Sequence, residues 1–258
     1  MKIGVCMKRV ADTETRVRVA GDGKAVDLAD VSFIISPYDE YAIEEAIRIK
    51  EKNDDAEVIL FCVDNEDSVK VIRNGLAMGA DRAMLINDPT IRPDEPFAVA
   101  QALAGALAAE QVTLALFGKH GVGQDYHQVP ALVAEILGWP QVAIAVKLEL
   151  DGENLMVHRE IEGGEEVVEC RLPAVISAQK GLNEPRYPSL KGIMQAKKKP
   201  LDTRTLADLG LDPLSAASWE VVKVELPPPR QAGKILEGEP EEQVRRLVEL
   251  LHSEAKVI

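Results

Sequence analysis

Residues 57–86 read EVILFCVDNEDSVKVIRNGLAMGADRAMLI, and their pattern decides the fold class. The apolar run at 57–63 is typical of a buried strand in a parallel sheet, and residues 65–78 have the spacing of a helix that Gly79 ends. The short apolar run at 83–86 predicts a second strand. A strand, a helix and another strand in this order form a βαβ unit, so the stretch predicts a parallel sheet.

The same alternation continues on both sides of this stretch. Residues 2–7 predict a strand, and Ser36 and Pro37 suit the start of a helix because Ser can cap and Pro fits the first helical position. The elements predicted further along are a helix at 96–110, a strand at 112–117 and a helix at 126–137. We therefore expect an α/β fold with a Rossmann-like parallel sheet and helices on both of its faces.

Beyond residue 140 the pattern changes to strand following strand. The predicted strands lie at 142–150, 155–160, 166–172 and 174–178, and their connectors Asp151-Gly152 and Gly163-Gly164 are typical of hairpin turns. These strands either extend the parallel sheet as an antiparallel edge or form a small companion sheet. Alternation also predicts a hairpin excursion at 16–26 and a strand at 219–226.

We predict two domains, with the boundary at residue 226. Residues 1–226 would form the Rossmann-like nucleotide-binding domain, and residues 227–258 a C-terminal arm. In the arm, the three prolines at 227–229 form a stiff spacer and residues 239–252 an amphipathic helix. This helix either reaches across to another subunit or folds back on its own sheet.

Composition narrows the function classes. The net charge of −13 argues against general affinity for nucleic acid. No apolar run approaches the roughly 20 residues that span a bilayer, and the N-terminus lacks a signal-peptide layout, so we expect a cytoplasmic chain, or a mitochondrial matrix one in a eukaryote. Cys6, Cys62 and Cys170 are typical of reduced thiols. Catalytic motifs and metal-ligand spacings are absent, so we assign no catalytic residue and no metal.

Residues 182–200, LNEPRYPSLKGIMQAKKKP, form a basic segment that we call the docking segment. Pro185 and Pro188 delay any helix until about Ser189. After that point Leu190, Ile193 and Met194 stand at helical spacing on one face, which is the arrangement used when a helix docks in a partner's groove. The alternative is an ordinary surface loop with solvated lysines.

A glycine-rich turn at residues 118–129, GKHGVGQDYHQV, is the strongest candidate for ligand binding. Its glycines let backbone amides approach an anion, and the following helix would offer its N-terminus to a phosphate. The spacing matches neither the dinucleotide fingerprint nor the Walker A motif, so we expect an adenine nucleotide without hydrolysis. The alternative is a turn without a ligand. Tyr38 could pack on a flat cofactor, although a core-filling role is the more common one.

Six stretches resemble the β subunit of electron transfer flavoprotein. They are CMKRV (6–10), SPYDEYAIEEAIRIKEK (36–52), LAMGADRA (76–83), REIEGGEEVVECRLPAVISA (159–178), LNEPRYPSLKGIMQAKKK (182–199) and PPPRQAG (227–233). The fourth resembles the family's signature and the fifth its partner-recognition loop. The resemblance implies a heterodimer with an α subunit, in which one FAD, held mostly by α, takes electrons from acyl-CoA or other flavin dehydrogenases. It passes them to a quinone-linked or other redox acceptor.

The resemblance also implies roles for individual residues. An AMP bound in β would be lined by Cys6, Ser36, Pro37, Tyr38, Asp39, Val63, Gly118, Lys119, His120, Gly121, Val122, Gly123, Gln124, Asp125, Tyr126, His127, Gln128 and Val129. Thr13 and Tyr38 would lie nearest the flavin held by α, and Glu160 would face a basic group on the mobile flavin domain. Leu190 would be the anchor inserted into a dehydrogenase, with Ile193 and Met194 beside it. The C-terminal arm would pack on α.

The glycine-rich turn departs from the family's usual forms and leaves the nucleotide open. Asp125 and Gln128 are kept, but the turn matches neither the AMP-holding members nor the electron-bifurcating members, which hold a second FAD and oxidise NADH. We expect AMP, because Tyr126 and His127 would crowd a flavin. The alternatives are a bifurcating, NADH-oxidising subunit and a free-standing sensor of adenine nucleotides. If the chain holds AMP as we expect, it is an electron carrier whose own residues do no bond chemistry.

Overall fold

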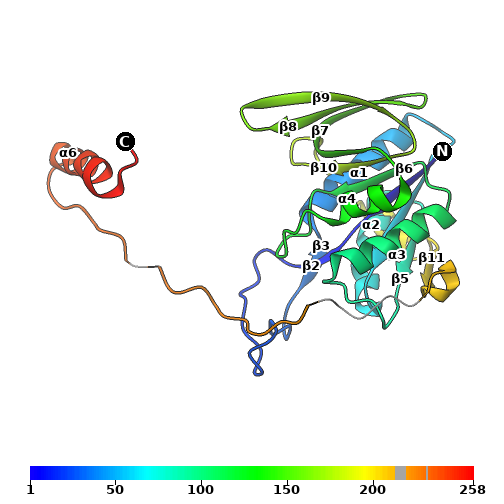
Figure 1. Ribbon diagram of the computed structural model, residues 1–258, viewed down its shortest axis with the longest axis horizontal. Helices are drawn as coiled ribbons and strands as arrows, with labels where there is room; N and C mark the ends of the chain where they lie inside the picture. The colour runs from blue at the N-terminus through cyan, green and yellow to red at the C-terminus, as the bar shows by residue number, and fades with distance from the viewer. Residues whose placement is uncertain (213–218, 231) are drawn as a thin grey trace. The chain divides into compact units, whose positions relative to one another are not determined.

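The computed structural model describes residues 1–212, 219–230 and 232–258 (Figure 1). The chain divides into two compact units. The first consists of Met1–Val17 and Leu28–Glu220, and the second of Arg18–Asp27 and Val221–Ile258. The prediction that residues 227–258 pack on a partner stays a prediction.

A single mixed sheet forms the centre of the first unit, and Figure 1 shows the parallel strands continuing into the antiparallel hairpins. Among the described residues the strand order is β11 (Leu201–Arg204), β5 (Arg82–Ile86), β4 (Glu57–Val63), β1 (Lys2–Cys6), β6 (Leu114–Gly118), β10 (Ala174–Ala178), β7 (Gln141–Asp151), β8 (Asn154–Ile161) and β9 (Gly164–Arg171). Neighbours from β11 to β7 pair in parallel, and β8 and β9 pair antiparallel. The α/β prediction is confirmed, with the hairpins as an edge of the same sheet.

Helices cover both faces of the parallel part. They are α1 (Pro37–Glu51), α2 (Val69–Met78, preceded by the 3-10 turn η1, Glu66–Ser68), α3 (Pro96–Ala109) and α4 (Val129–Leu137). Alternation along β4 separates two apolar cores, because successive side chains point to opposite faces. Leu60 and Cys62 pack in the core that includes residues of α1 and α2, whereas Ile59 and Phe61 pack with residues of α3 and α4.

One predicted helix boundary and one predicted helix cap need correction. The helix expected to begin near Tyr126 begins at Val129, because Asp125 and His127 adopt positive φ angles of 51° and 55°, which a helix does not accept. The Ser36 side chain makes no capping bond at the start of α1, although Ser36 occupies the N-cap position.

The strand expected at 219–226 is not formed. A strand needs a neighbour for its backbone groups. In this region the Val224 amide bonds to the Gly23 carbonyl at 2.8 Å, but residues 219–226 form no strand, and the Val222 side chain is exposed. β11 was not predicted, because LDTR has no apolar run. A small second sheet pairs β2 (Arg9–Ala11) with β3 (Phe33–Ile35).

The second unit contains the predicted hairpin excursion and the predicted terminal helix. In the hairpin, Val19 and Val26 form one antiparallel bridge, flanked by a bond from the Ala20 amide to the Ala25 carbonyl at 2.9 Å. The helix α6 spans Pro240–Leu250 and continues as the π-helical turn η3, Leu251–Ala255. Residues 227–230 of the proline spacer have no regular structure, and Gln231 of the PPPRQAG stretch lies outside the described residues.

Candidate functional site

A pocket lies at the carboxyl ends of β1 and β6, where open α/β sheets place their ligands. Its cavity volume is about 90 Å³. The predicted residues that line it are Cys6, Asp39, Val63, Gly118, His120, Gly121, Gln124, Tyr126, His127, Gln128 and Val129. The structure therefore brings the end of β1, the first turn of α1 and the glycine-rich turn together.

Lining residues outside the predicted nucleotide-binding set come mainly from α3 and the segment before it. They are Met7, Lys8, Pro93, Asp94, Pro96, Val99, Leu103, Phe117 and Pro130. Lys8 carried a usable signal, because it follows the first strand at its carboxyl end. Pro93 and Asp94 carried none, since only the packing of α3 brings them to the pocket.

The other predicted residues of this set do not line the pocket. They are Ser36, Pro37, Tyr38, Lys119, Val122, Gly123 and Asp125. Ser36 is bonded to the glycine-rich turn. Its hydroxyl donates to the His120 carbonyl and accepts from the Val122 amide, both at 3.4 Å. Tyr38 packs edge-on against the His120 ring at 4.7 Å between centroids, with the Lys119 ammonium 4.6 Å from the Tyr38 ring centre.

Asp39 joins α1 to the ends of two strands. One carboxylate oxygen accepts the Lys8 amide at 2.7 Å, and the other accepts the Gly118 amide at 2.9 Å. Gly118 has to be glycine here, since a Cβ atom would lie 2.4 Å from the Asp39 carboxylate and 2.7 Å from the Tyr38 backbone. Burial raises the pKa of Asp39 to about 7, although the two backbone amides act in the opposite direction.

Lys8 supplies a cation to the pocket. Its ammonium donates to the Gln124 side chain and, at 3.4 Å, to the Pro93 carbonyl, so it bridges the glycine-rich turn and the segment before α3. Burial lowers the pKa of Lys8, and the nearby carboxylates of Asp39 and Asp94 partly offset this effect. Arg9 does not line the pocket, because its guanidinium pairs with Asp64 at 2.7 Å.

Two histidines form part of the rim. His120 Nδ1 lies 2.6 Å from His127 Nε2, and His120 Nε2 lies 3.3 Å from an Asp125 carboxylate oxygen. Burial and the neighbouring His127 lower the pKa of His120, which favours the neutral imidazole. A neutral ring can accept or donate one hydrogen bond at the rim without adding charge.

The amides of the glycine-rich turn are largely used within the fold. The Val122 amide bonds to Ser36, the Gly123 amide to the Asp125 carboxylate at 3.2 Å, and the Asp125 amide to the Gly121 carbonyl at 3.1 Å. These three amides are therefore already paired within the fold. Lys8 is the group best placed to meet a phosphate.

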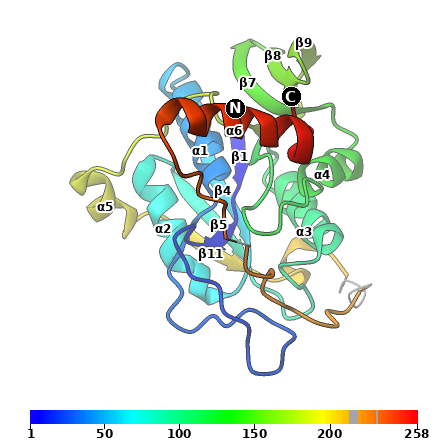
Figure 2. The same ribbon diagram turned by 90° about the vertical axis from the view of Figure 1, so that its left-hand side faces the viewer.

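The docking segment contains a short helix, α5 (Leu190–Ala196), which lies beside α2 (Figure 2). Ser189 caps it by accepting the Gly192 amide at 3.0 Å, so the predicted start is confirmed. The exposed fractions are 82% for Leu190, 65% for Met194 and 46% for Ile193. The three predicted side chains thus face outward from a helix.

The two remaining predicted residues lie away from the pocket. Thr13 is exposed in the turn after β2. Glu160 lies on β8, where its carboxylate accepts the Gln179 side-chain amide at 2.9 Å. Among the described residues, no cluster of His, Cys, Asp and Glu could hold a metal ion, and no helix there has the length and apolarity needed to cross a membrane. The thiols of Cys6 and Cys62 are buried, and that of Cys170 is half-buried.

A mostly parallel sheet with helices on both faces and a pocket at its carboxyl edge defines the class of Rossmann-like α/β proteins. Residues 25–209, more than half of the chain, match the family model for the electron transfer flavoprotein domain. The chain is 44% identical to the electron transfer flavoprotein subunit beta of Bacillus subtilis and 41% identical to that of Bradyrhizobium diazoefficiens, with full coverage of both chains in each comparison. It is 39% identical to the human subunit beta, over 97% of this chain and 98% of the human one. The chain belongs to the electron transfer flavoprotein β-subunit family.

Proposed function

We propose that this β subunit forms a heterodimer with an α subunit and carries electrons from flavin dehydrogenases to a downstream acceptor. The FAD that accepts and releases electrons would be held mostly by α, with Thr13, Tyr38 and Glu160 on the side that faces it. The observation that carries the proposal is the outward display of Leu190 and Met194 on α5. Large apolar side chains with such exposure are typical of a surface that a partner covers.

The pocket at the ends of β1 and β6 would hold AMP in a structural role. Its residues fit this ligand, because Cys6, Val63 and Leu103 offer an apolar surface for the base while Lys8 offers a cation for the phosphate. Entry of the nucleotide would break the Lys8–Gln124 contact and widen the cavity of about 90 Å³. A second FAD is a poorer fit, since Tyr126 and His127 already line the rim of a small cavity.

The C-terminal helix would pack on α. The helix α6 is amphipathic, and its apolar face is about half exposed at Val244, Leu247 and Val248. A helix of this kind gains most from a surface that covers its apolar face. We propose a cytoplasmic location, or the mitochondrial matrix in a eukaryote.

Counting the small molecules tests this assignment. The αβ complex is purified, its ligands are released with acid, and FAD and AMP are quantified by mass spectrometry. One FAD and one AMP per heterodimer is the expected result. Two FAD molecules would instead establish a bifurcating subunit, and a stable homodimer free of flavin would establish a nucleotide sensor.

A further inference from the structure

Hydrogen bonds and ion pairs hold the docking segment to the rest of the fold on both sides of α5. On the N-terminal side the contacts run to α1, and on the C-terminal side to α2. Between these two sets, Tyr187 and Leu190 are among the most exposed large side chains of the described residues. The segment is thus fixed at both ends and exposes large side chains between them. An ordinary surface loop does not explain this combination.

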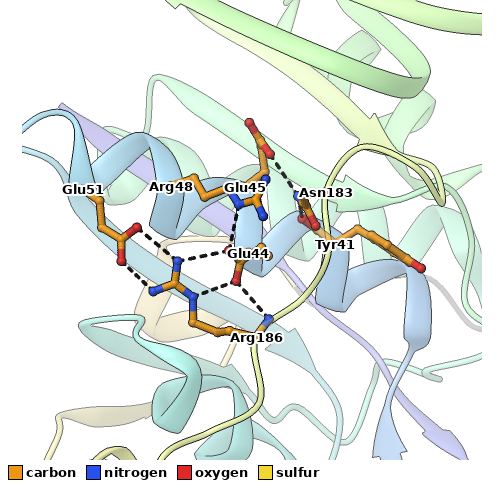
Figure 3. Close-up of polar contacts among 7 residues, drawn as sticks. All are labelled: Tyr41, Glu44, Glu45, Arg48, Glu51, Asn183 and Arg186. Atoms are coloured by element: carbon orange, nitrogen blue, oxygen red, sulfur yellow. Dashed lines mark hydrogen bonds and ion pairs between the residues drawn. The ribbon is translucent and has the colours of Figure 1, made fainter.

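Arg186 makes the N-terminal attachment (Figure 3). Its guanidinium donates to both carboxylate oxygens of Glu44, at 2.8 and 3.0 Å, and to both of Glu51, at 2.5 and 3.1 Å. The Glu44 side chain is only 3% exposed and that of Arg186 is 35% exposed, so this pair is partly shielded from water. Bidentate bonds between guanidinium and carboxylate fix orientation as well as distance. Asn183 adds bonds of 2.9 Å to the Tyr41 carbonyl and to the Glu45 carboxylate.

The C-terminal attachment is reciprocal. Arg73 of α2 donates at 2.6 Å to the carbonyls of Ala196 and Lys199, which end α5 and follow it. In return, the Lys199 ammonium donates at 2.9 Å to the Leu76 carbonyl and at 2.5 Å to the Ala80 carbonyl, at the end of α2. Each helix thus has one carbonyl of its last turn, that of Ala196 in α5 and that of Leu76 in α2, bonded by a cation from the other segment.

Backbone contact completes the arrangement. A Cβ atom on Gly192 would lie 2.4 Å from the Ala77 carbonyl oxygen, so α5 rests directly against the backbone of α2. A helix this short is not stable alone in water. Its conformation before partner binding therefore depends on the contacts with α1 and α2.

We propose that Arg186, Arg73 and Lys199 are positioning residues that hold the docking segment in its binding conformation before a partner arrives. The inference rests on the proposed function, in which Leu190 anchors a dehydrogenase. A preformed segment does not have to be ordered on binding, which avoids part of the entropic cost of association. The segment would then act as a rigid anchor and not as a loop that folds on its partner.

Hydrogen exchange tests whether these contacts order the segment. In the intact αβ complex, Arg186→Gln is expected to speed amide exchange at residues 189–198 by about tenfold. The matched control is Arg48→Gln, because Arg48 also pairs with Glu44, at 2.8 Å, but lies outside the docking segment. It should leave exchange at residues 189–198 within about twofold of the parent. Unchanged exchange in the Arg186 variant would overturn the inference.

A second variant covers the case in which Arg186→Gln fails to fold. Glu51 is half exposed, and Glu51→Gln removes one of the two carboxylates while Arg186 keeps Glu44. It is expected to speed exchange at residues 189–198 by about threefold. Exchange identical to the parent in a folded Glu51 variant would also contradict the inference.

A double-mutant cycle tests whether positioning acts through Leu190. The readout is the rate at which an acyl-CoA dehydrogenase, reduced with its substrate, reduces the complex's flavin. Arg186→Gln should slow this rate about three- to tenfold in the parent but have little further effect in the Leu190→Ala background. Equal slowing in both backgrounds would contradict positioning. If Leu190→Ala alone leaves the rate unchanged, the proposed docking function fails, while hydrogen exchange still reports on the contacts.

Discussion

At the scale of single residues, Asp39 links three segments of the chain that line the pocket. Its carboxylate joins the backbone of β1 to that of β6 through the Lys8 and Gly118 amides. The resemblance had assigned it to ligand binding. Its bonds in the structure show a second role, because the same oxygens that line the pocket also hold α1 against the strand ends.

Asp39 should make stability depend on pH. Its folded pKa of about 7 lies above the ordinary value of 3.8, so the folded chain binds more protons than the unfolded one between these values. Stability from this group is therefore present at low pH and is lost as pH rises through 7. Relative to Asp39→Asn, the parent should lose about 2–3 kcal/mol of unfolding free energy between pH 5 and 8. Urea unfolding at several pH values measures this difference, and a constant difference would contradict it.

Lys8 should determine nucleotide affinity. Lys8→Met removes the cation beside the pocket while keeping an aliphatic side chain, so AMP should bind about 10- to 100-fold more weakly. Lys119→Met is the matched control, because the Lys119 ammonium lies over Tyr38 and does not line the pocket. Calorimetric titration of AMP into the nucleotide-depleted complex measures both affinities. Equal losses in the two variants would mean that general charge, and not Lys8, governs binding.

At the scale of elements, Gly192 should affect how closely α5 packs on α2, and this effect should outweigh its low helix propensity. Alanine is favoured over glycine in a helix by about 1 kcal/mol. Gly192→Ala should nevertheless loosen α5 from α2, because its Cβ atom would meet the Ala77 carbonyl. The expected signs are faster amide exchange across α5 and slower flavin reduction by the dehydrogenase. Gln195→Ala, at an exposed position of the same helix, should cause neither change.

Helices and strands were predictable where a short stretch of sequence carries the whole signal. The strand at 57–63 and that at 174–178 were predicted with their observed bounds, because buried strands are continuous apolar runs. β11 escaped prediction because most of its side chains are exposed at a sheet edge. The strand predicted at 219–226 failed because, among the described residues, its alternating stretch has the Val224–Gly23 backbone bond but no strand ladder.

The candidate site was predictable only in part. The glycine-rich turn and Asp39 follow predicted strands or begin predicted helices, so their position at the sheet edge could be foreseen. Pro93, Val99 and Leu103 reach the pocket through the packing of α3, which no local signal encodes. The use of the turn's amides in its own hydrogen bonds depends on Ser36 and on two positive φ angles, and these were also beyond sequence reasoning.

At the scale of the whole molecule, the first unit contains two separate surfaces. One is the pocket at the ends of β1 and β6, and the other is the exposed face of α5, held by α1 and α2. In an acidic chain with a net charge of −13, the docking segment is locally basic, with Lys191, Lys197 and Lys198 exposed. Under the proposed docking function, this contrast favours a partner surface with an apolar pocket and an acidic rim.

The rate of flavin reduction in Leu190→Ala tests the central claim most directly. The αβ complex carrying this change is mixed with a substrate-reduced acyl-CoA dehydrogenase, and flavin absorbance is followed by stopped flow. Loss of a central apolar anchor should slow reduction at least about tenfold, because truncating a hot-spot side chain costs about 2 kcal/mol or more of binding free energy. The flavin spectrum and flavin content should stay unchanged. Reduction as fast as in the parent would contradict the claim that α5 docks the electron donor.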